Sequence, residues 1–515
     1  MDIRRRDFLL GASAIPAAMS SAVSAQTGGP PGLAYRTARD LVAALGAREV
    51  SAVELTNAAI ARIEALDGKL NAVVVRDFDN ARAAAKEADA ALARGERRPL
   101  LGIPMTVKEA FNVAGLPTTW GIPTAKGRLV ADDAATVERL KAAGAIIIGK
   151  TNVPLMLIDW QSYNEVYGTT NNPWDVTRTP GGSSGGSAAA LAAGFVPLEL
   201  GSDLGGSLRV PAHFCGVFAH KPTHGLVPLR GSVPPGAPSL PVEIDLSVAG
   251  PMARSADDLA LALDVLAGPD APMATAYKLA LPSPRHERLA DYRVLVIDTH
   301  PLLPTANAIR AALDGLADRL AKAGAKVART SPLLPDLGLL TRTYFSLMYS
   351  FFSADIPIEG YRRLKQVAAA IAPEANDLDT IGSRGLVLDH RDWIWADRTR
   401  NGIAARWRDL FREFDLVLCP VVPTTAFPHD HGDRQTRRID IDGTSHRYSY
   451  QAVWAGLATL TGQPATAVPI GRSDQGLPIG VQIIGPYLED RTTIAFAGLI
   501  EREFGGFVAP PGFAG

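Results

Sequence analysis

A glycine-rich segment at residues 181–211 limits what this chain can fold into more than any other feature. It reads GGSSGGSAAALAAGFVPLELGSDLGGSLRVP and holds two serines flanked by glycine, Ser183 and Ser207. Glycine permits unusual dihedral angles and a close approach of the backbone to other groups. Apolar runs adjoin both serines, so the segment belongs to a core and is not a flexible linker. The sequence therefore predicts two buried loops that each present a hydroxyl.

A lysine upstream of these serines stands in a setting that favours its neutral form. Lys108 ends the largely apolar run 101–107, and burial lowers the pKa of a lysine because it disfavours the ammonium. A serine must lose its proton to attack a carbonyl, and a neutral lysine within hydrogen-bond reach can accept that proton. Two hydroxyls and one amine can form a proton relay that needs neither histidine nor metal. This chemistry is acyl transfer at an amide or ester carbonyl.

The same segment permits two other interpretations. A phosphate-binding loop would need the Lys-Ser/Thr pair of the P-loop, which this segment lacks. Residues 181–185 also satisfy G-x-S-x-G, the nucleophile elbow of α/β-hydrolases. Ser183 would then be the nucleophile, with His390 or His446 as the downstream base. That interpretation leaves Lys108 and the second glycine-flanked serine without a role.

These motifs resemble those of the amidase signature family of serine hydrolases. That family has a lysine in a P-x-x-V-K-like strand, a serine in a cis peptide within GGSSGG, and a nucleophilic serine in D-x-G-G-S-[IL]-R-x-P. This chain has PMTVK at 104–108, GGSSGG at 181–186 and DLGGSLRVP at 203–211. The similarity covers roughly residues 36–505 and is weakest in the middle third. It also includes NNPW at 171–174, KPT at 221–223, LTGQP at 460–464 and GLPIGVQ at 476–482.

The resemblance implies a Ser–Ser–Lys triad that hydrolyses an amide through an acyl-enzyme without a cofactor or metal. Ser207 would attack the carbonyl, and Ser183 would pass its proton to Lys108. Backbone amides near the nucleophile could converge on the developing oxyanion; they belong to Leu204, Gly205, Gly206 and Ser207. Three further residues of the motifs would support these loops, namely Ser184, Asp203 and Arg209.

Alternating helix and strand patterns predict an α/β fold: one large, mixed, twisted β-sheet covered by helices on both faces. A capping box over Ser51–Glu54 opens a helix that runs to about residue 65. Further helices are expected at 81–93, 134–143 and 188–193. Strands are expected at 145–148 (before a turn at Gly149), 293–297, 326–328, 416–418 and 481–484.

We expect residues 30–515 to form a single amidase domain. A segment rich in proline and glycine separates the signature core from a variable, substrate-shaping region at about 293–413. The C-terminal block again resembles the family core, so the chain is expected to return to the same sheet.

The N-terminus predicts export from a bacterial cell. Twin arginines within residues 4–6 precede Phe-Leu-Leu at 8–10, and an alanine-rich apolar stretch follows. Val-Ser-Ala at 23–25 fits a small-residue cleavage site. This pattern resembles a twin-arginine signal peptide at residues 1–25, which is too short and too weakly apolar for a convincing membrane span. The mature protein would be periplasmic or secreted, with no membrane contact after cleavage.

Composition excludes several partners. A net charge of −1 and a pI near 6.8 give no basic field for nucleic acid, so a neutral small-molecule amide is the expected substrate. We expect a monomer or homodimer. The two cysteines, Cys215 and Cys419, fit a chain that is not built on disulfides.

Several conspicuous residues have ordinary explanations. His429 and His431 lie in a polar, arginine-rich loop without fixed ligand geometry, so a loop is favoured over a metal site. His213 is expected to pack locally, although it could tune specificity. Trp160 and Tyr344 are expected in the core, with a role in the substrate or acyl pocket as the alternative.

Other functions remain open from the sequence. The same triad would serve an esterase or lactam hydrolase. A transamidation component, like the A subunit of glutamyl-tRNA amidotransferase, works in the cytoplasm, which conflicts with an export signal. A catalytically idle periplasmic binding protein would not need the three triad residues. Aliphatic, aryl, amino-acid and peptide C-terminal amides all remain possible substrates.

Overall fold

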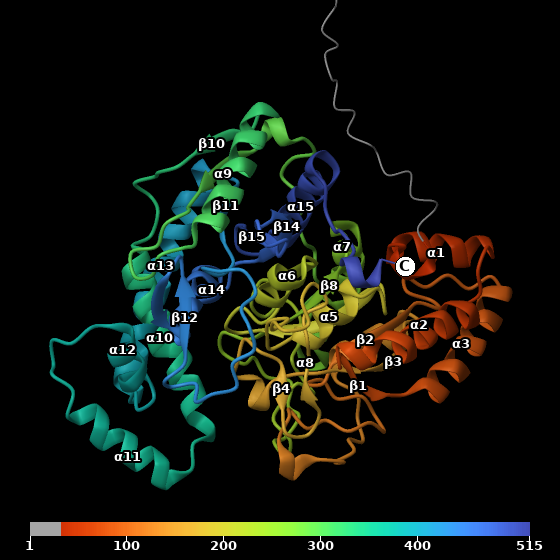
Figure 1. Cartoon of the computed structure of the whole chain (residues 1–515), viewed down its shortest axis with the longest axis horizontal. Coiled ribbons are helices and arrows are strands. Elements are labelled where there is room, and N and C mark those ends of the chain that lie inside the picture. The colour runs from red at the N-terminus through yellow and green to blue at the C-terminus, as the bar shows by residue number, and fades with distance from the viewer. Residues whose placement is uncertain (1–31, 515) are drawn as a thin grey trace, which may run out of the picture.

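The computed structural model describes residues 32–514 (Figure 1). The predicted signal peptide at residues 1–25 lies outside the described residues, so its cleavage and export role stay predictions. Among the described helices, none combines the length and the apolar character needed to cross a membrane.

The centre of the molecule is one mixed sheet of 11 strands in the order β1-β3-β2-β6-β8-β7-β14-β15-β11-β9-β10. Its strands are β1 (Val73–Arg76), β2 (Pro104–Lys108), β3 (Ile146–Thr151), β6 (Leu198–Asp203), β7 (Phe218–Lys221), β8 (Val248–Ala253), β9 (Arg293–Val296), β10 (Lys326–Ala328), β11 (Leu416–Pro420), β14 (Ala465–Arg472) and β15 (Pro478–Ile484). Two small hairpins are formed by β4 (Tyr163–Asn164) with β5 (Gly168–Thr169), and by β12 (Arg438–Ile441) with β13 (Thr444–Arg447). The C-terminal segment thus returns to the same sheet, as the sequence predicts.

Helices cover both faces of this sheet. Every residue of β2, β6, β8 and β15 is buried, and successive side chains of a strand point to opposite faces. Full burial of consecutive residues therefore requires cover on both sides, which confirms the predicted layered α/β architecture. The mostly apolar composition of β8 and β15 follows from the same requirement.

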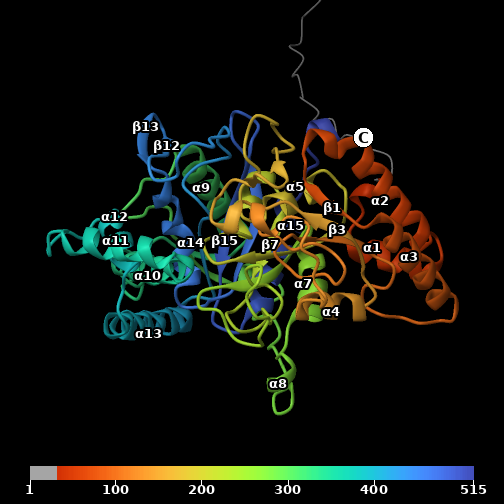
Figure 2. The ribbon, with the colours of Figure 1, turned by 90° about the horizontal axis from the view of Figure 1, so that it is seen from below.

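The helices divide into groups along the sheet (Figures 1 and 2). Those before the first glycine-serine loop are α1 (Ala38–Ala47), α2 (Ala52–Leu66), α3 (Phe78–Ala93) and α4 (Ala135–Ala142). Those of the signature core are α5 (Gly185–Ala192), α6 (Arg209–Cys215), α7 (Ala256–Leu266) and α8 (Ala271–Ala274), and α8 lies at the tip of a loop that extends from the body in Figure 2. The remaining ones are α9 (Asn307–Lys322), α10 (Leu337–Phe352), α11 (Ile358–Ala369), α12 (Leu378–Gly385), α13 (His390–Glu413), α14 (Ala452–Thr459) and α15 (Asp490–Phe504).

Local sequence signals explain where these elements begin. The predicted capping box is present: Ser51 Oγ accepts the Glu54 N–H, and the Glu54 carboxylate accepts the Ser51 N–H. This arrangement satisfies two amides that the first helical turn leaves unpaired. The expected helices at 81–93 and 188–193 are confirmed but begin three residues earlier, at Phe78 and Gly185.

The turn expected at Gly149 is wrong. Strand β3 continues through Gly149 to Thr151 and pairs with both β1 and β2. A Cβ at Gly149 would lie 2.3 Å from the Val75 carbonyl oxygen. Glycine here permits a close approach between strands at an irregular register, which is the second common role of glycine inside a strand pattern.

Candidate active site

Two neighbouring parallel strands bring the candidate base to the candidate nucleophile loop. Lys108 is the last residue of β2, and Asp203 is the last residue of β6, which pairs with β2 in parallel. Carboxyl ends of parallel strands meet at the same edge of a sheet, where α/β proteins commonly form their sites. The chain passes directly from Asp203 into the loop that holds Ser207, so one sheet edge positions both groups.

Lys108 is fully buried and its side chain meets only neutral hydroxyls. Its Nζ lies 2.7 Å from Ser183 Oγ and 2.9 Å from Ser202 Oγ. Burial, opposed by the nearby Asp203 carboxylate, lowers the pKa of Lys108 to about 7. A neutral amine keeps a lone pair that can accept a proton from the Ser183 hydroxyl. The sequence motifs predicted Lys108 and Ser183 together, but Ser202 was missed because nothing in its sequence setting distinguishes it from other serines.

The loop that holds Ser183 packs tightly against its surroundings. The peptide bond between Gly182 and Ser183 is cis, as the family resemblance implies. A Cβ at Gly182 would lie 2.5 Å from the Asp159 carbonyl oxygen, so only glycine fits there. Ser184 is the N-cap residue of α5, and its N–H donates to the Ser207 carbonyl at 3.2 Å. The two glycine-serine loops are therefore in direct contact.

The loop around Ser207 offers unpaired backbone donors. Within the described residues, the amides of Leu204, Gly205 and Ser207 make no hydrogen bond, and neither does the Ser207 hydroxyl. Gly206 differs from the expectation of four available donors, because its N–H donates to Asp203 Oδ1 at 2.8 Å. Gly206 has φ +97°, a conformation that favours glycine. The structure thus leaves three of the four predicted amides for an oxyanion.

A buried ion pair holds this loop. Arg209 Nη2 and Nε donate to the two Asp203 carboxylate oxygens at 2.9 and 3.0 Å, and both side chains are at most 1% exposed. Burial alone would raise the pKa of Asp203, but the charge and hydrogen bonds of Arg209 lower it to about 2. Arg209 also donates to Thr459 and Gln482 in the C-terminal segment. Asp203 and Arg209 thus support the Ser207 loop, as the motifs imply, and link it to helix α14 and strand β15.

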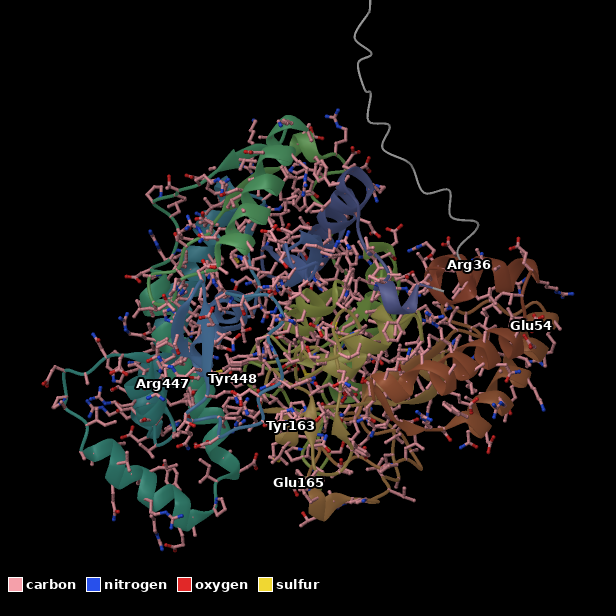
Figure 3. The ribbon with its side chains drawn as sticks, in the orientation of Figure 1. Arg36, Glu54, Tyr163, Glu165, Arg447 and Tyr448 are labelled. Carbon is pink, nitrogen blue, oxygen red and sulfur yellow. The ribbon has the colours of Figure 1, made fainter. Side chains whose placement is uncertain are left out.

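A second buried network stands beside the site. Arg437 Nη1 and the Tyr448 hydroxyl donate to the two oxygens of Asp159 at 2.8 and 2.6 Å. Arg437 Nη2 also donates to the Tyr163 hydroxyl at 3.0 Å, and Figure 3 labels Tyr163 and Tyr448 on segments far apart in the sequence. The Tyr448 ring packs on Trp160, with centroids 5.7 Å apart. This network fixes the segment that precedes the Ser183 loop and was not predicted.

The histidines lie elsewhere. Among the described residues, no histidine hydrogen-bonds to Ser183 or Ser207, which removes support from the nucleophile-elbow interpretation. His390 stacks on Trp393, and His446 lies on β13. Burial lowers the pKa of His213 to about 4, and its Nε2 contacts the Thr424 carbonyl at 3.2 Å. His213 therefore packs locally as a neutral ring.

The loop with the two other conspicuous histidines is held by ordinary contacts. His429 Nε2 contacts Asn171 Oδ1 at 3.0 Å, and the His431 ring stacks on Tyr163 at 3.8 Å. In residues 32–514, no group of three or more His, Cys, Asp or Glu side chains could hold a metal ion. Cys215 and Cys419 are buried and unbridged, and burial raises their thiol pKa.

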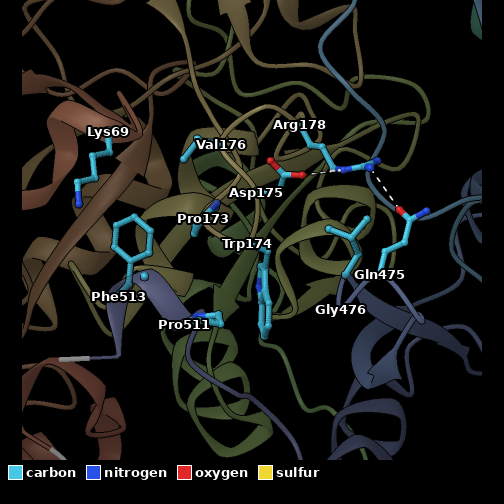
Figure 4. Close-up of a pocket in the computed structure, with 12 residues that line it drawn as sticks. Lys69, Pro173, Trp174, Asp175, Val176, Arg178, Gln475, Gly476, Pro511 and Phe513 are labelled. Carbon is cyan, nitrogen blue, oxygen red and sulfur yellow. Dashed lines mark hydrogen bonds and ion pairs between the residues drawn. The ribbon is translucent and has the colours of Figure 1, made fainter.

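A surface pocket of about 680 Å³ lies apart from these loops (Figure 4). Trp174, Phe513 and Lys69 line it, together with an Arg178 side chain that bonds to both Asp175 and Gln475. None of Lys108, Ser183 and Ser207 lines this pocket. It is therefore not the place where the candidate relay would act.

Comparisons with known proteins identify the family. The amidase family model matches residues 54–494. The chain is 35% identical over 495 residues to the A subunit of the glutamyl-tRNA(Gln) amidotransferase of Anaeromyxobacter dehalogenans, covering 92% of this chain and 97% of that protein. It is also 35% identical over 485 residues to the putative amidase AmiB2 of Mycobacterium bovis, with the same coverage of each chain.

Solved structures agree. A crystal structure of an amidase, 28% identical, matches with a TM-score of 0.73 and covers 91% of this chain and all of that one. The residues matched by the family model contain both glycine-serine loops, the buried lysine and the C-terminal strands. This chain belongs to the amidase signature family and is an amide-hydrolysing enzyme.

Proposed function

We propose that this amidase acts on a small neutral amide through a relay from Ser207 to Ser183 to Lys108. One observation carries the proposal: Lys108 Nζ lies 2.7 Å from Ser183 Oγ in full burial, with a pKa lowered to about 7. A lysine at that pKa is substantially neutral near pH 7 and can serve as a general base. The direct contact between the Ser184 amide and the Ser207 carbonyl supports the adjacency of the two serines.

The reaction then runs in two stages. Ser207 Oγ attacks the carbonyl carbon while its proton passes to Ser183 and the Ser183 proton passes to Lys108. The unpaired amides of the loop stabilise the oxyanion of the tetrahedral intermediate. The relay returns a proton to the leaving nitrogen, which departs as ammonia or an amine and leaves an ester on Ser207. Water repeats the cycle and releases the acid.

An ammonia-release screen over a panel of amides tests the substrate class. We expect turnover of at least one small neutral amide by the wild type and none by the Ser207→Ala variant. The same nucleophile could also cleave esters and lactams. Matched esters and a lactam are therefore assayed in parallel, so that an esterase or a lactam hydrolase can be told apart from an amidase. Turnover of an ester or the lactam with no turnover of any linear amide would favour that alternative instead.

We also propose export through the twin-arginine route, on the pattern of residues 4–10 and 23–25. The mature protein should begin at Gln26, and replacing both Arg5 and Arg6 with lysine should trap the precursor in the cytoplasm. Cell fractionation and N-terminal sequencing measure these outcomes. The matched control is Arg36→Lys, which lies past the predicted cleavage site and should be exported normally. Export of the double variant, or an intact N-terminus on periplasmic protein, would contradict the proposal.

A further inference from the structure

The peptide groups of the nucleophile loop are held from their carbonyl side. A trans peptide directs its C=O and N–H to opposite sides. The Gly206 carbonyl accepts the Val210 N–H at 2.7 Å, which fixes the direction of the Ser207 N–H. The Leu204 carbonyl accepts the hydroxyl of Tyr344 at 2.9 Å, which fixes the direction of the Gly205 N–H. Both of these N–H groups lack a hydrogen-bond partner among the described residues, so both are available to an external acceptor.

The Ser207 and Gly205 amides are oriented by different kinds of contact. The Ser207 amide is fixed by the first turn of α6, so it depends only on the local fold. The Gly205 amide depends on a side chain from α10, in the variable region at 293–413. The intervening Gly206 amide faces the other way, toward Asp203. One tyrosine hydroxyl is thus the contact that orients the Gly205 donor.

Tyr344 itself is rigidly placed. It is 0% exposed, and its ring lies against the backbone of α14, where a Cβ at Gly456 would come within 2.5 Å of the ring. Its ring also meets Phe345 edge-on, with centroids 6.0 Å apart. Burial raises the pKa of the Tyr344 phenol, so the hydroxyl keeps its proton and can donate throughout the working pH range. The side chain has one position from which to donate.

We propose that Tyr344 is a positioning residue for the oxyanion hole: its hydroxyl holds the Leu204 carbonyl so that the Gly205 N–H is preorganised as a donor. The inference rests on the proposed role of Ser207 and its loop. Preorganised donors accelerate a reaction because they need no reorientation as charge develops. Tyr344 therefore acts through Gly205 and stabilises the transition state more than the bound substrate.

The expected signature is a kcat effect with little KM effect. Removing one oxyanion donor outright costs about 10²–10³ in kcat, and loosening one should cost about tenfold or more. Tyr344→Phe should therefore lower kcat about tenfold to a hundredfold and leave KM nearly unchanged. The pH midpoint of kcat/KM should stay at its wild-type value, because Lys108 and its partners are untouched.

The test compares Tyr344→Phe with Tyr292→Phe in the full-length enzyme. Tyr292 is the matched control: it is also 0% exposed, and its hydroxyl also donates to a backbone carbonyl, that of His286 at 3.0 Å. The substrate is the best amide of the panel, and exhaustive fluorophosphonate labelling counts active sites. Phenylboronic acid serves as the probe of the hole, because its adduct with serine is a tetrahedral anion. Its Kd should weaken in proportion to kcat for Tyr344→Phe alone.

A second variant keeps the inference testable if Tyr344→Phe folds poorly. Gly456→Ala keeps the phenol but displaces its ring, and should reproduce the kcat loss and the weaker boronic-acid binding. Wild-type kcat per labelled site in Tyr344→Phe, or an equal loss in Tyr292→Phe, would overturn the inference. Persistent activity in Ser207→Ala would overturn the proposed function instead, so the two failures are distinguishable.

Discussion

Replacing Ser207 with alanine is expected to lower kcat about a million-fold, the loss typical of removing a nucleophile that acts within a relay. The fold should survive, because the Ser207 hydroxyl makes no hydrogen bond within the described residues and the residue is 9% exposed in its loop. The change in the free energy of unfolding should stay within about 1 kcal/mol. Ammonia release measures the first quantity and thermal unfolding the second.

The matched control for Ser207→Ala is Ser232→Ala. Ser232 is similarly buried, at 6% exposure, and lies outside both glycine-serine loops. It should retain wild-type activity. A fluorophosphonate should label wild-type enzyme at Ser207, as located by peptide mass mapping. Labelling at Ser183 would instead revive the nucleophile-elbow interpretation, and turnover by Ser207→Ala would refute the proposed nucleophile.

The second large effect is expected at Lys108. The pKa of Lys108 is about 7, so at lower pH the amine carries a proton and cannot accept another. The value of kcat/KM should therefore rise with pH through about 7 and stay high in the alkaline range. Lys108→Ala should remove this rise and lower kcat/KM by about 10²–10⁴-fold. Lys108→Arg should not restore activity, because a guanidinium keeps its charge.

Lys150→Met supplies the control for burial. Lys150 is also fully buried, and burial, opposed by the charge of Glu109, lowers its pKa to about 8, but it donates to Thr118 and the Pro117 carbonyl. The variant should keep the rise near pH 7. Near-wild-type activity in Lys108→Ala would refute the proposed relay, and another residue would then have to act as the general base.

The same pKa has a consequence for stability. Because the folded-state pKa of Lys108 lies below its usual 10.5, the unfolded chain binds more protons between about pH 7 and 10.5. The contribution of Lys108 to stability therefore improves as pH rises through this window and is worst at and below pH 7. Lys108→Met, which fills the space without an amine, should accordingly raise Tm most at low pH.

The sequence predicted the parts of this enzyme that short motifs encode. Lys108, Ser183 and the Asp203–Arg209 pair lie within distinctive glycine and proline patterns, and the alternation of buried strands with helices indicated the layered fold. The lysine contact with Ser202 could not be predicted, because it depends on the register at which β2 pairs with β6. The turn prediction at Gly149 is wrong because close strand packing overrides the local turn propensity of glycine.

Long-range contacts account for the remaining gaps. Asp159, Arg437 and Tyr448 meet only after the chain has folded, and none of the three stands in a recognisable motif. The prediction that Tyr344 packs in the core is confirmed by its burial, but its hydroxyl contact with the Leu204 carbonyl lies across 140 residues of sequence. Such pairs carry no local pattern, so only the tertiary structure reveals them.

The order of strands also determines when the Ser207 loop acquires its full support during folding. Strands β14 and β15, from residues 465–484, lie between β7 and β11 in the middle of the sheet. They and the preceding helix supply Gln482 and Thr459, which hold the Arg209 side chain behind the nucleophile loop. A ribosome-bound chain lacks these partners until residues 459–482 have been synthesised. Arg209 therefore acquires its full set of hydrogen bonds only after residues 459–482 have joined the sheet, so the support of the Ser207 loop is completed late.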